Sequence, residues 1–141
     1  MRFVLIILAA VIVSACADPN QEKIDSLKAE AIAVHDEVMP QMGLIADLKG
    51  TLKKQWQEAK KDTTGMGDSL TPILAAHITM LDSADEAMMS WMADYDPTYA
   101  KHHSSDSAIV YYGSEGEKIT EVKLLMEKAI EDAERLVDNS K

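Results

Sequence analysis

Histidine and methionine side chains recur at helical spacing in the first third of the chain, where they could bind a soft metal ion. His35, Met39 and Met42 stand in the segment "HDEVMPQM". At about 100° per residue of an α-helix, these side chains lie within about 60° of one another. Thioethers and imidazoles are ligands that suit Cu(I), and His77 and Met80 could complete such a site from a facing helix.

The same residues also fit a helical core. Methionine fills irregular gaps in bundle cores, and a histidine on an apolar helix face is more often a hydrogen-bonded core residue than a ligand. Val34, Val38 and Ile45 set the core direction, with His35 and Met42 on its flank. We therefore interpret "HDEVMPQM" chiefly as a kinked core segment of a protein without a cofactor, and copper binding is the alternative.

A second group of side chains could contact a partner protein. Met89 and Met92 lie at the edge of an apolar stripe, and Trp91 and Tyr95 stand beside them. Tryptophan, tyrosine and methionine are enriched at protein interfaces. Because an aromatic residue on an apolar helix face is usually buried, core packing is the preferred interpretation of Trp91.

Sequence patterns typical of catalysis do not occur. The chain contains no Gly-x-Ser-x-Gly turn, and no His-Glu-x-x-His spacing links its four histidines. His102 and His103 stand in the polar run "KHHSSD", where we expect them to be solvated. The sequence therefore predicts a protein that is not an enzyme and that has an interaction or structural role.

The N-terminus predicts export. An apolar run at residues 4–13 follows Arg2 and is too short to span a bilayer, as in a signal peptide. The ending "VSAC" resembles the lipobox of bacterial lipoproteins, in which cleavage precedes a cysteine that then carries lipid. Cys16 is the only cysteine and cannot form an internal disulfide. The alternative is a secreted protein cleaved after Ala15 or Ala17.

This leader divides the chain into a signal peptide at 1–15, a lipidated N-terminus and short tether at 16–19, and a helical domain at 20–141. Acyl chains on one cysteine give stable anchoring. Many Gram-negative lipoproteins kept in the inner membrane have aspartate where this chain has Ala17. We therefore expect the outer membrane, with the domain on the periplasmic side, and the cell surface as the alternative.

The overall charge limits the classes of partner. The formal net charge is −10, which argues against binding nucleic acid. The expected partners are the membrane, through the lipid anchor, and an unidentified envelope protein.

Apolar residues predict a long first helix over residues 20–61. One heptad phase runs through this segment at Ile24, Ala31, Val38, Ile45, Leu52 and Ala59, with Leu27, Val34 and Leu48 at the partner position. The phase continues through Pro40, which lacks an amide donor and opposes a straight helix. We predict one kinked helix, and a break into two helices, giving a four-helix bundle, is the alternative.

A second helix is predicted after a loop at residues 62–69. Thr71 and Pro72 fit an N-cap and first turn, and the helix runs to about Tyr95. Its predicted apolar face consists of Leu70, Ile73, Leu74, His77, Leu81, Ala84, Met88 and Trp91.

Residues 96–105 lack periodicity and predict an extended connector. The last helix is predicted over residues 117–138, with Ser114 and Glu117 as a capping box, or from as early as Asp106. Three amphipathic helices of these lengths predict an all-α fold, a three-helix antiparallel bundle with a long, kinked first helix.

Three segments together resemble a known group of proteins. These are "HDEVMPQM", "AMMSWMADYDP" at residues 87–97 and "EGEKITEV" at residues 115–122. They are similar to small uncharacterised helical lipoproteins of Bacteroidetes-type bacteria, some of them labelled viral A-type inclusion proteins. The resemblance covers most of the mature chain and implies a helical lipoprotein, but it implies no activity.

Overall fold

The structure is a computed structural model that describes residues 19–139, so the predicted signal peptide and Cys16 lie outside the described residues. Within that range the chain is 88% helical and contains no strand, which confirms the all-α prediction. Its elements are α1 (Pro19–Val38), α2 (Gln41–Ala59), α3 (Met66–Asp94), the short 3-10 helix η1 (Tyr99–Lys101) and α4 (Ser105–Asn139). In this part of the chain, no helix has the length and hydropathy that a membrane-spanning segment needs.

Helices α1 and α2 form one long helix that bends by 38° next to Pro40. Pro40 itself has helical dihedral angles, φ −60° and ψ −22°. The amide of Met39 donates to the carbonyl of His35 at 2.8 Å, and the amide of Met42 donates to the carbonyl of Met39 at 3.2 Å. Because proline lacks an amide hydrogen and its ring crowds the preceding turn, the helix bends without ending. The predicted kinked helix is therefore confirmed.

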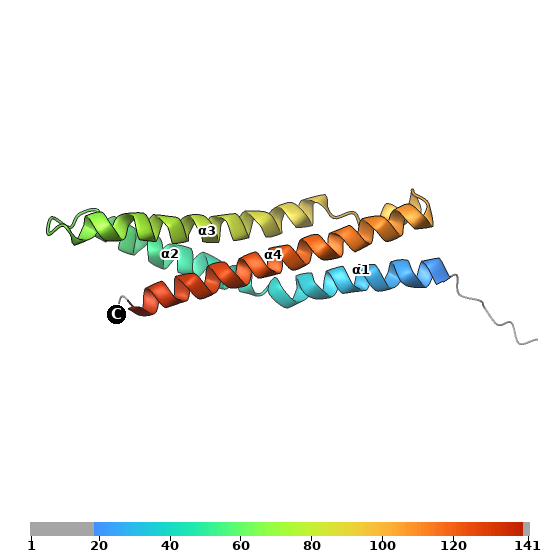
Figure 1. The fold of residues 1–141 in the computed structure, drawn as a ribbon, viewed down its shortest axis with the longest axis horizontal. Helices are drawn as coiled ribbons and strands as arrows, with labels where there is room; N and C mark the ends of the chain where they lie inside the picture. Colours follow the sequence, from blue (N-terminus) through green and yellow to red (C-terminus); the bar gives the residue numbers. More distant parts are fainter. Residues whose placement is uncertain (1–18, 140–141) are drawn as a thin grey trace, which may run out of the picture.

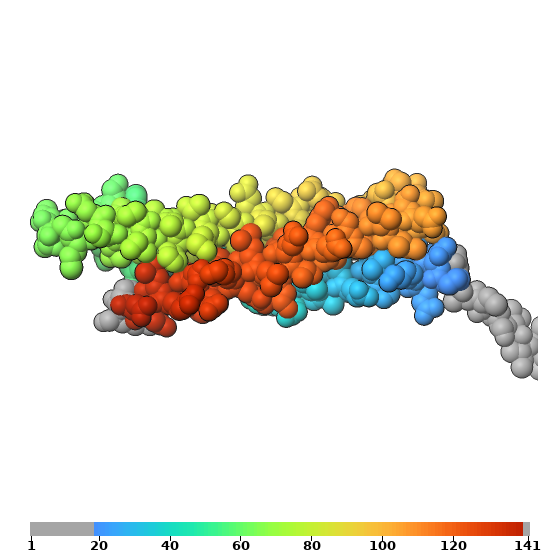
Figure 2. Space-filling view, in the orientation of Figure 1, coloured from blue at the N-terminus to red at the C-terminus, as the bar shows by residue number. Residues whose placement is uncertain are grey.

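The three helices form an elongated bundle (Figures 1 and 2). Helix α3 runs antiparallel to the long helix and packs along α2 (Figure 1). Helix α4 then returns beside α1 and also contacts α3. The predicted three-helix antiparallel bundle is confirmed.

The predicted heptad phase gives the core of the long helix. Its six residues are all buried: Ile24, Ala31, Val38, Ile45, Leu52 and Ala59. On α3 the prediction is correct for Leu74 and the buried residues that follow, but wrong for Leu70 and Ile73, which are 37% and 46% exposed. The first turns of α3 extend beyond the end of α4 (Figures 1 and 2). Ile73 is exposed although the next residue, Leu74, is buried, so Ile73 lies on the side of α3 that faces away from the core.

Helix α3 begins five residues before the predicted N-cap at Thr71. The carboxylate of Asp62 accepts hydrogen bonds from the amides of Thr64 at 2.9 Å and Gly67 at 3.0 Å, and these bonds close the turn. Gly65 provides the positive φ of 89° that the turn requires. The Thr71 hydroxyl instead donates to the carbonyl of Gly67 inside the helix at 2.7 Å.

The connector before α4 is folded, so the prediction of an extended connector is wrong. The amide of Asp96 donates to the hydroxyl of Tyr111 at 2.6 Å, and the hydroxyl of Tyr112 donates to the carbonyl of Asp96 at 3.3 Å. These bonds hold the connector against the first turns of α4. The last helix begins at Ser105, within one residue of the earlier predicted start at Asp106. The predicted capping box at Ser114 and Glu117 is wrong, because both residues lie inside α4.

Candidate functional site

The structure separates His35 from the two ligands predicted on the facing helix, His77 and Met80. The ring of His35 stacks with that of Trp91, with centroids 5.5 Å apart. Met80 and His77 precede Trp91 on α3 by eleven and fourteen residues, which is about 16 and 21 Å along the helix axis. Metal–ligand bonds are only about 2 Å long, so one ion could not be bound by His35 together with His77 or Met80.

The individual side chains fit packing roles. Met39 and Met42 are half-buried and pack against the main core cluster, which confirms the interpretation of "HDEVMPQM" as a kinked core segment. The Nδ1–H of His77 donates to the carbonyl of Ile73 at 2.8 Å. Within residues 19–139, no cluster of three or more histidine, cysteine or acidic side chains could hold a metal ion. Copper binding by the methionines remains a prediction.

The predicted partner-binding residues differ in exposure. Trp91 is only 6% exposed, which confirms its predicted core packing. Met92 and Tyr95 are half-buried against the core, and Met89 is exposed on the outer side of α3. Trp91 therefore has little exposed ring surface with which to contact a partner protein.

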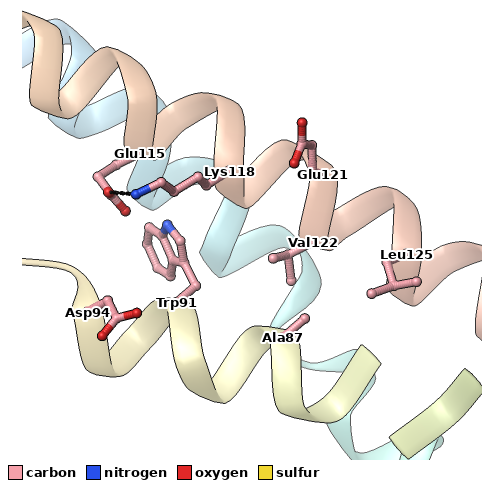
Figure 3. A pocket seen from close by; sticks show the side chains of 8 residues that line it. All are labelled: Ala87, Trp91, Asp94, Glu115, Lys118, Glu121, Val122 and Leu125. Carbon is pink, nitrogen blue, oxygen red and sulfur yellow. Dashed lines mark hydrogen bonds and ion pairs between the residues drawn. The ribbon is translucent and has the colours of Figure 1, made fainter. Parts of the chain in front are cut away.

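A groove between α3 and α4 brings Trp91 together with a buried acid that the sequence analysis did not identify (Figure 3). The groove encloses a cavity of about 360 Å³. It is lined by Ala87, Trp91 and Asp94 from α3 and by Glu115, Lys118, Glu121, Val122 and Leu125 from α4. The indole nitrogen of Trp91 points toward the Glu115 and Lys118 pair (Figure 3).

Glu115 stands where the helix pattern calls for an apolar residue. It lies between the buried residues Tyr112 and Ile119 at spacings of three and four, so all three face the core. Glu115 is 2% exposed. An acid inside the apolar stripe of the last helix was the signal in the sequence that could have identified it.

Two buried polar atoms of the groove lining, and a third on the adjacent Tyr95, have no hydrogen-bond partner in the described part of the chain. They are Oε2 of Glu115, Nε1 of Trp91 and the hydroxyl oxygen of Tyr95. The other carboxylate oxygen of Glu115, Oε1, accepts from Nζ of Lys118 at 2.7 Å. Each unpartnered buried polar group costs about 1–3 kcal/mol, so the site is destabilising for the fold alone.

The protonation of two neighbouring groups defines what the site can donate. Burial, followed by the charges of nearby groups including Glu115, raises the pKa of Tyr95 to about 12, so its hydroxyl remains a donor at neutral pH. The hydrogen bond to Glu115 raises the pKa of Lys118, which therefore stays cationic. The groove lining thus offers the neutral N–H of Trp91 and one free oxygen of Glu115, with the Tyr95 hydroxyl buried beside them.

Aromatic packing holds Trp91 in place. Its ring stacks with that of Tyr95 at 4.9 Å between centroids, in addition to the stack with His35. The contacts continue through Tyr112 to Tyr99 and Tyr111 at the end of the bundle. The indole ring is therefore held between His35 of α1 and Tyr95, the residue that follows α3.

Comparisons with protein-family models, curated proteins and solved structures find no match for this chain. The functional argument therefore rests on the chemistry of the groove. The residues that line the groove include no serine, threonine, cysteine or histidine.

Proposed function

We propose that this chain is a non-catalytic helical binding module, anchored to the outer membrane by lipid on Cys16, and that its α3–α4 groove binds an envelope protein. The observation that carries the proposal is the buried Oε2 of Glu115, which has no partner at the floor of an open groove. Local rules of folding are broken chiefly at functional sites, where a ligand supplies the missing contacts. The indole N–H of Trp91, which also lines the groove, adds a donor that a polypeptide partner could satisfy.

The tether supports a partner close to the membrane. Three peptide units separate Cys16 from Pro19, the first residue of α1, and they span at most about 10 Å. Glu115 lies ten residues after Ser105, the first residue of α4, or about 15 Å along the helix axis. The starts of α1 and α4 lie at the same end of the bundle (Figure 1). The lipid anchor would therefore hold the groove within reach of proteins at the membrane surface.

Site-specific photo-crosslinking in intact envelopes tests the proposal. A benzoylphenylalanine at Leu125, which lines the groove, should crosslink to one envelope protein. The same residue at Ile32 on α1 is the matched control, because both native side chains are 38% exposed. Equal crosslinking from the two positions, or no crosslink from Leu125, would contradict a docking role for the groove.

A further inference from the structure

We propose that the α3–α4 groove takes the cationic end of a lysine or arginine side chain from the partner protein, which binds Glu115. This inference rests on the proposed function and specifies the chemistry of the partner. It follows from the charges that line the groove, from the contact that Lys118 makes with Glu115, and from the donor beside them.

The charge of the groove favours a cation. Asp94, Glu115 and Glu121 line it, and Lys118 is the single basic residue among the lining side chains. Residues 62–96, which include all of α3, contain seven acidic residues and no lysine or arginine. An anionic ligand would be repelled by the three carboxylates, whereas a cation would be attracted.

Lys118 occupies part of the site that the partner's lysine or arginine side chain, the guest cation, would use. Its Nζ binds only one oxygen of the buried carboxylate, Oε1 of Glu115, and its own side chain is exposed on the surface of α4. Lys118 is the exposed member of this pair, so its ammonium group is readily hydrated when it leaves, and the guest cation would take over its role of balancing the buried carboxylate. A guest cation could then bind both oxygens of Glu115, including the free Oε2.

The donor in the groove lining fits a polypeptide that carries this cation. The N–H of Trp91 requires an acceptor, and a backbone carbonyl beside a basic residue would supply it. A sugar is a poorer fit, because the Trp91 ring is 6% exposed and already stacks with two other rings. The cavity of about 360 Å³ has room for a side chain.

The indole N–H signals of the full-length mature lipoprotein, purified in detergent, provide a direct measurement by NMR. The chain has two tryptophans, and Trp56→Phe identifies the signal of Trp91. The probes are n-butylammonium, n-butylguanidinium and the neutral 1-butanol. We expect saturable shifts of the Trp91 signal with one or both cations and little change with 1-butanol. The cation that binds more tightly indicates whether the groove takes lysine or arginine.

Two substitutions should change the affinity in opposite directions. Glu115→Gln keeps the shape of the side chain but removes its charge, so the cations should bind at least about tenfold more weakly. Lys118→Met removes the internal competitor, so binding should become severalfold tighter. Glu117→Gln, the same change on an exposed part of α4 outside the groove, is the control and should not alter the affinity.

The results also separate this inference from the proposed function. Binding of 1-butanol as tight as that of the cations, or undiminished cation binding by Glu115→Gln, would overturn the inference. If the Glu115→Gln variant still crosslinks to the partner through position 125 as efficiently as the wild type, the groove binds a protein without using a cation. Loss of that crosslink in Glu115→Gln, but not in Glu117→Gln, supports both proposals.

Discussion

At the scale of single residues, two largely buried charged side chains, Lys49 and Glu115, differ in how many hydrogen-bond partners they have. The mostly buried Lys49 binds Asp82 at 2.6 Å and Asp85 at 2.9 Å, and these hydrogen bonds raise its pKa. Glu115 is more deeply buried but has a partner on only one of its oxygens. Lys49 therefore joins α2 to α3, whereas Glu115 costs stability and offers a binding contact.

Glu115→Met should consequently stabilise the protein. Removing a buried carboxylate with an unpartnered oxygen, and filling its space with an apolar side chain of similar length, should raise the free energy of unfolding by about 1–3 kcal/mol. Urea denaturation followed by circular dichroism measures this change. Glu117→Met is the control at an exposed position of the same helix, and a loss of stability in Glu115→Met would show that the carboxylate supports the fold.

At the scale of elements, the bend between α1 and α2 is part of the packed core. Val38 and Ile45 lie on either side of Pro40 and are both fully buried. The other helices therefore pack against a bent helix, and straightening it would move one of these residues out of place.

Pro40→Ala should change the free energy of unfolding by less than about 1 kcal/mol. Removing proline from an ordinary helix interior gains about 3 kcal/mol, but here a straighter helix would lose core contacts. Denaturation in urea tests this, with Pro97→Ala in the connector outside the helices as the control for the greater freedom of the unfolded chain. A gain near 3 kcal/mol would mean that the core does not depend on the bend.

At the scale of the whole molecule, the predicted anchor would determine which end of the bundle faces the membrane. The start of α1, the connector with η1 and the start of α4 lie at one end, and the α2–α3 turn lies at the other (Figure 1). Lipid on Cys16 would place the first end near the headgroups. The exposed side chains of Leu70 and Ile73 would then lie at the end far from the membrane.

The anchor itself is tested by Cys16→Ser. Without the thiol, no lipid can be attached and signal peptidase II should not cleave, so the uncleaved precursor should accumulate. Radiolabelled fatty acid should label the wild type and not the variant. Equal labelling of the two proteins would rule out Cys16 as the site of lipidation.

The heptad phase of the sequence determined the long helix and its buried face. Ile24 and Ala59 belong to one apolar series that passes through Pro40. The residues of this series can all face the same core only if the helix continues across the proline. Periodicity of this kind is local, because it depends only on the rise and turn of the helix. It therefore predicted the number of helices and most of the core.

Only the tertiary structure decided which neighbours cover each apolar face. Leu70 and Ile73 follow the apolar pattern of α3, yet they are more than a third exposed while Leu74, beside Ile73, is buried, because the pattern does not specify how wide a stripe the neighbouring helices cover. Tyr111 folds a connector that has no periodicity of its own, through a hydrogen bond across fifteen residues. The site around Glu115 likewise requires Trp91 from another helix, because periodicity identifies the apolar side of a helix but does not specify the partners that pack against it.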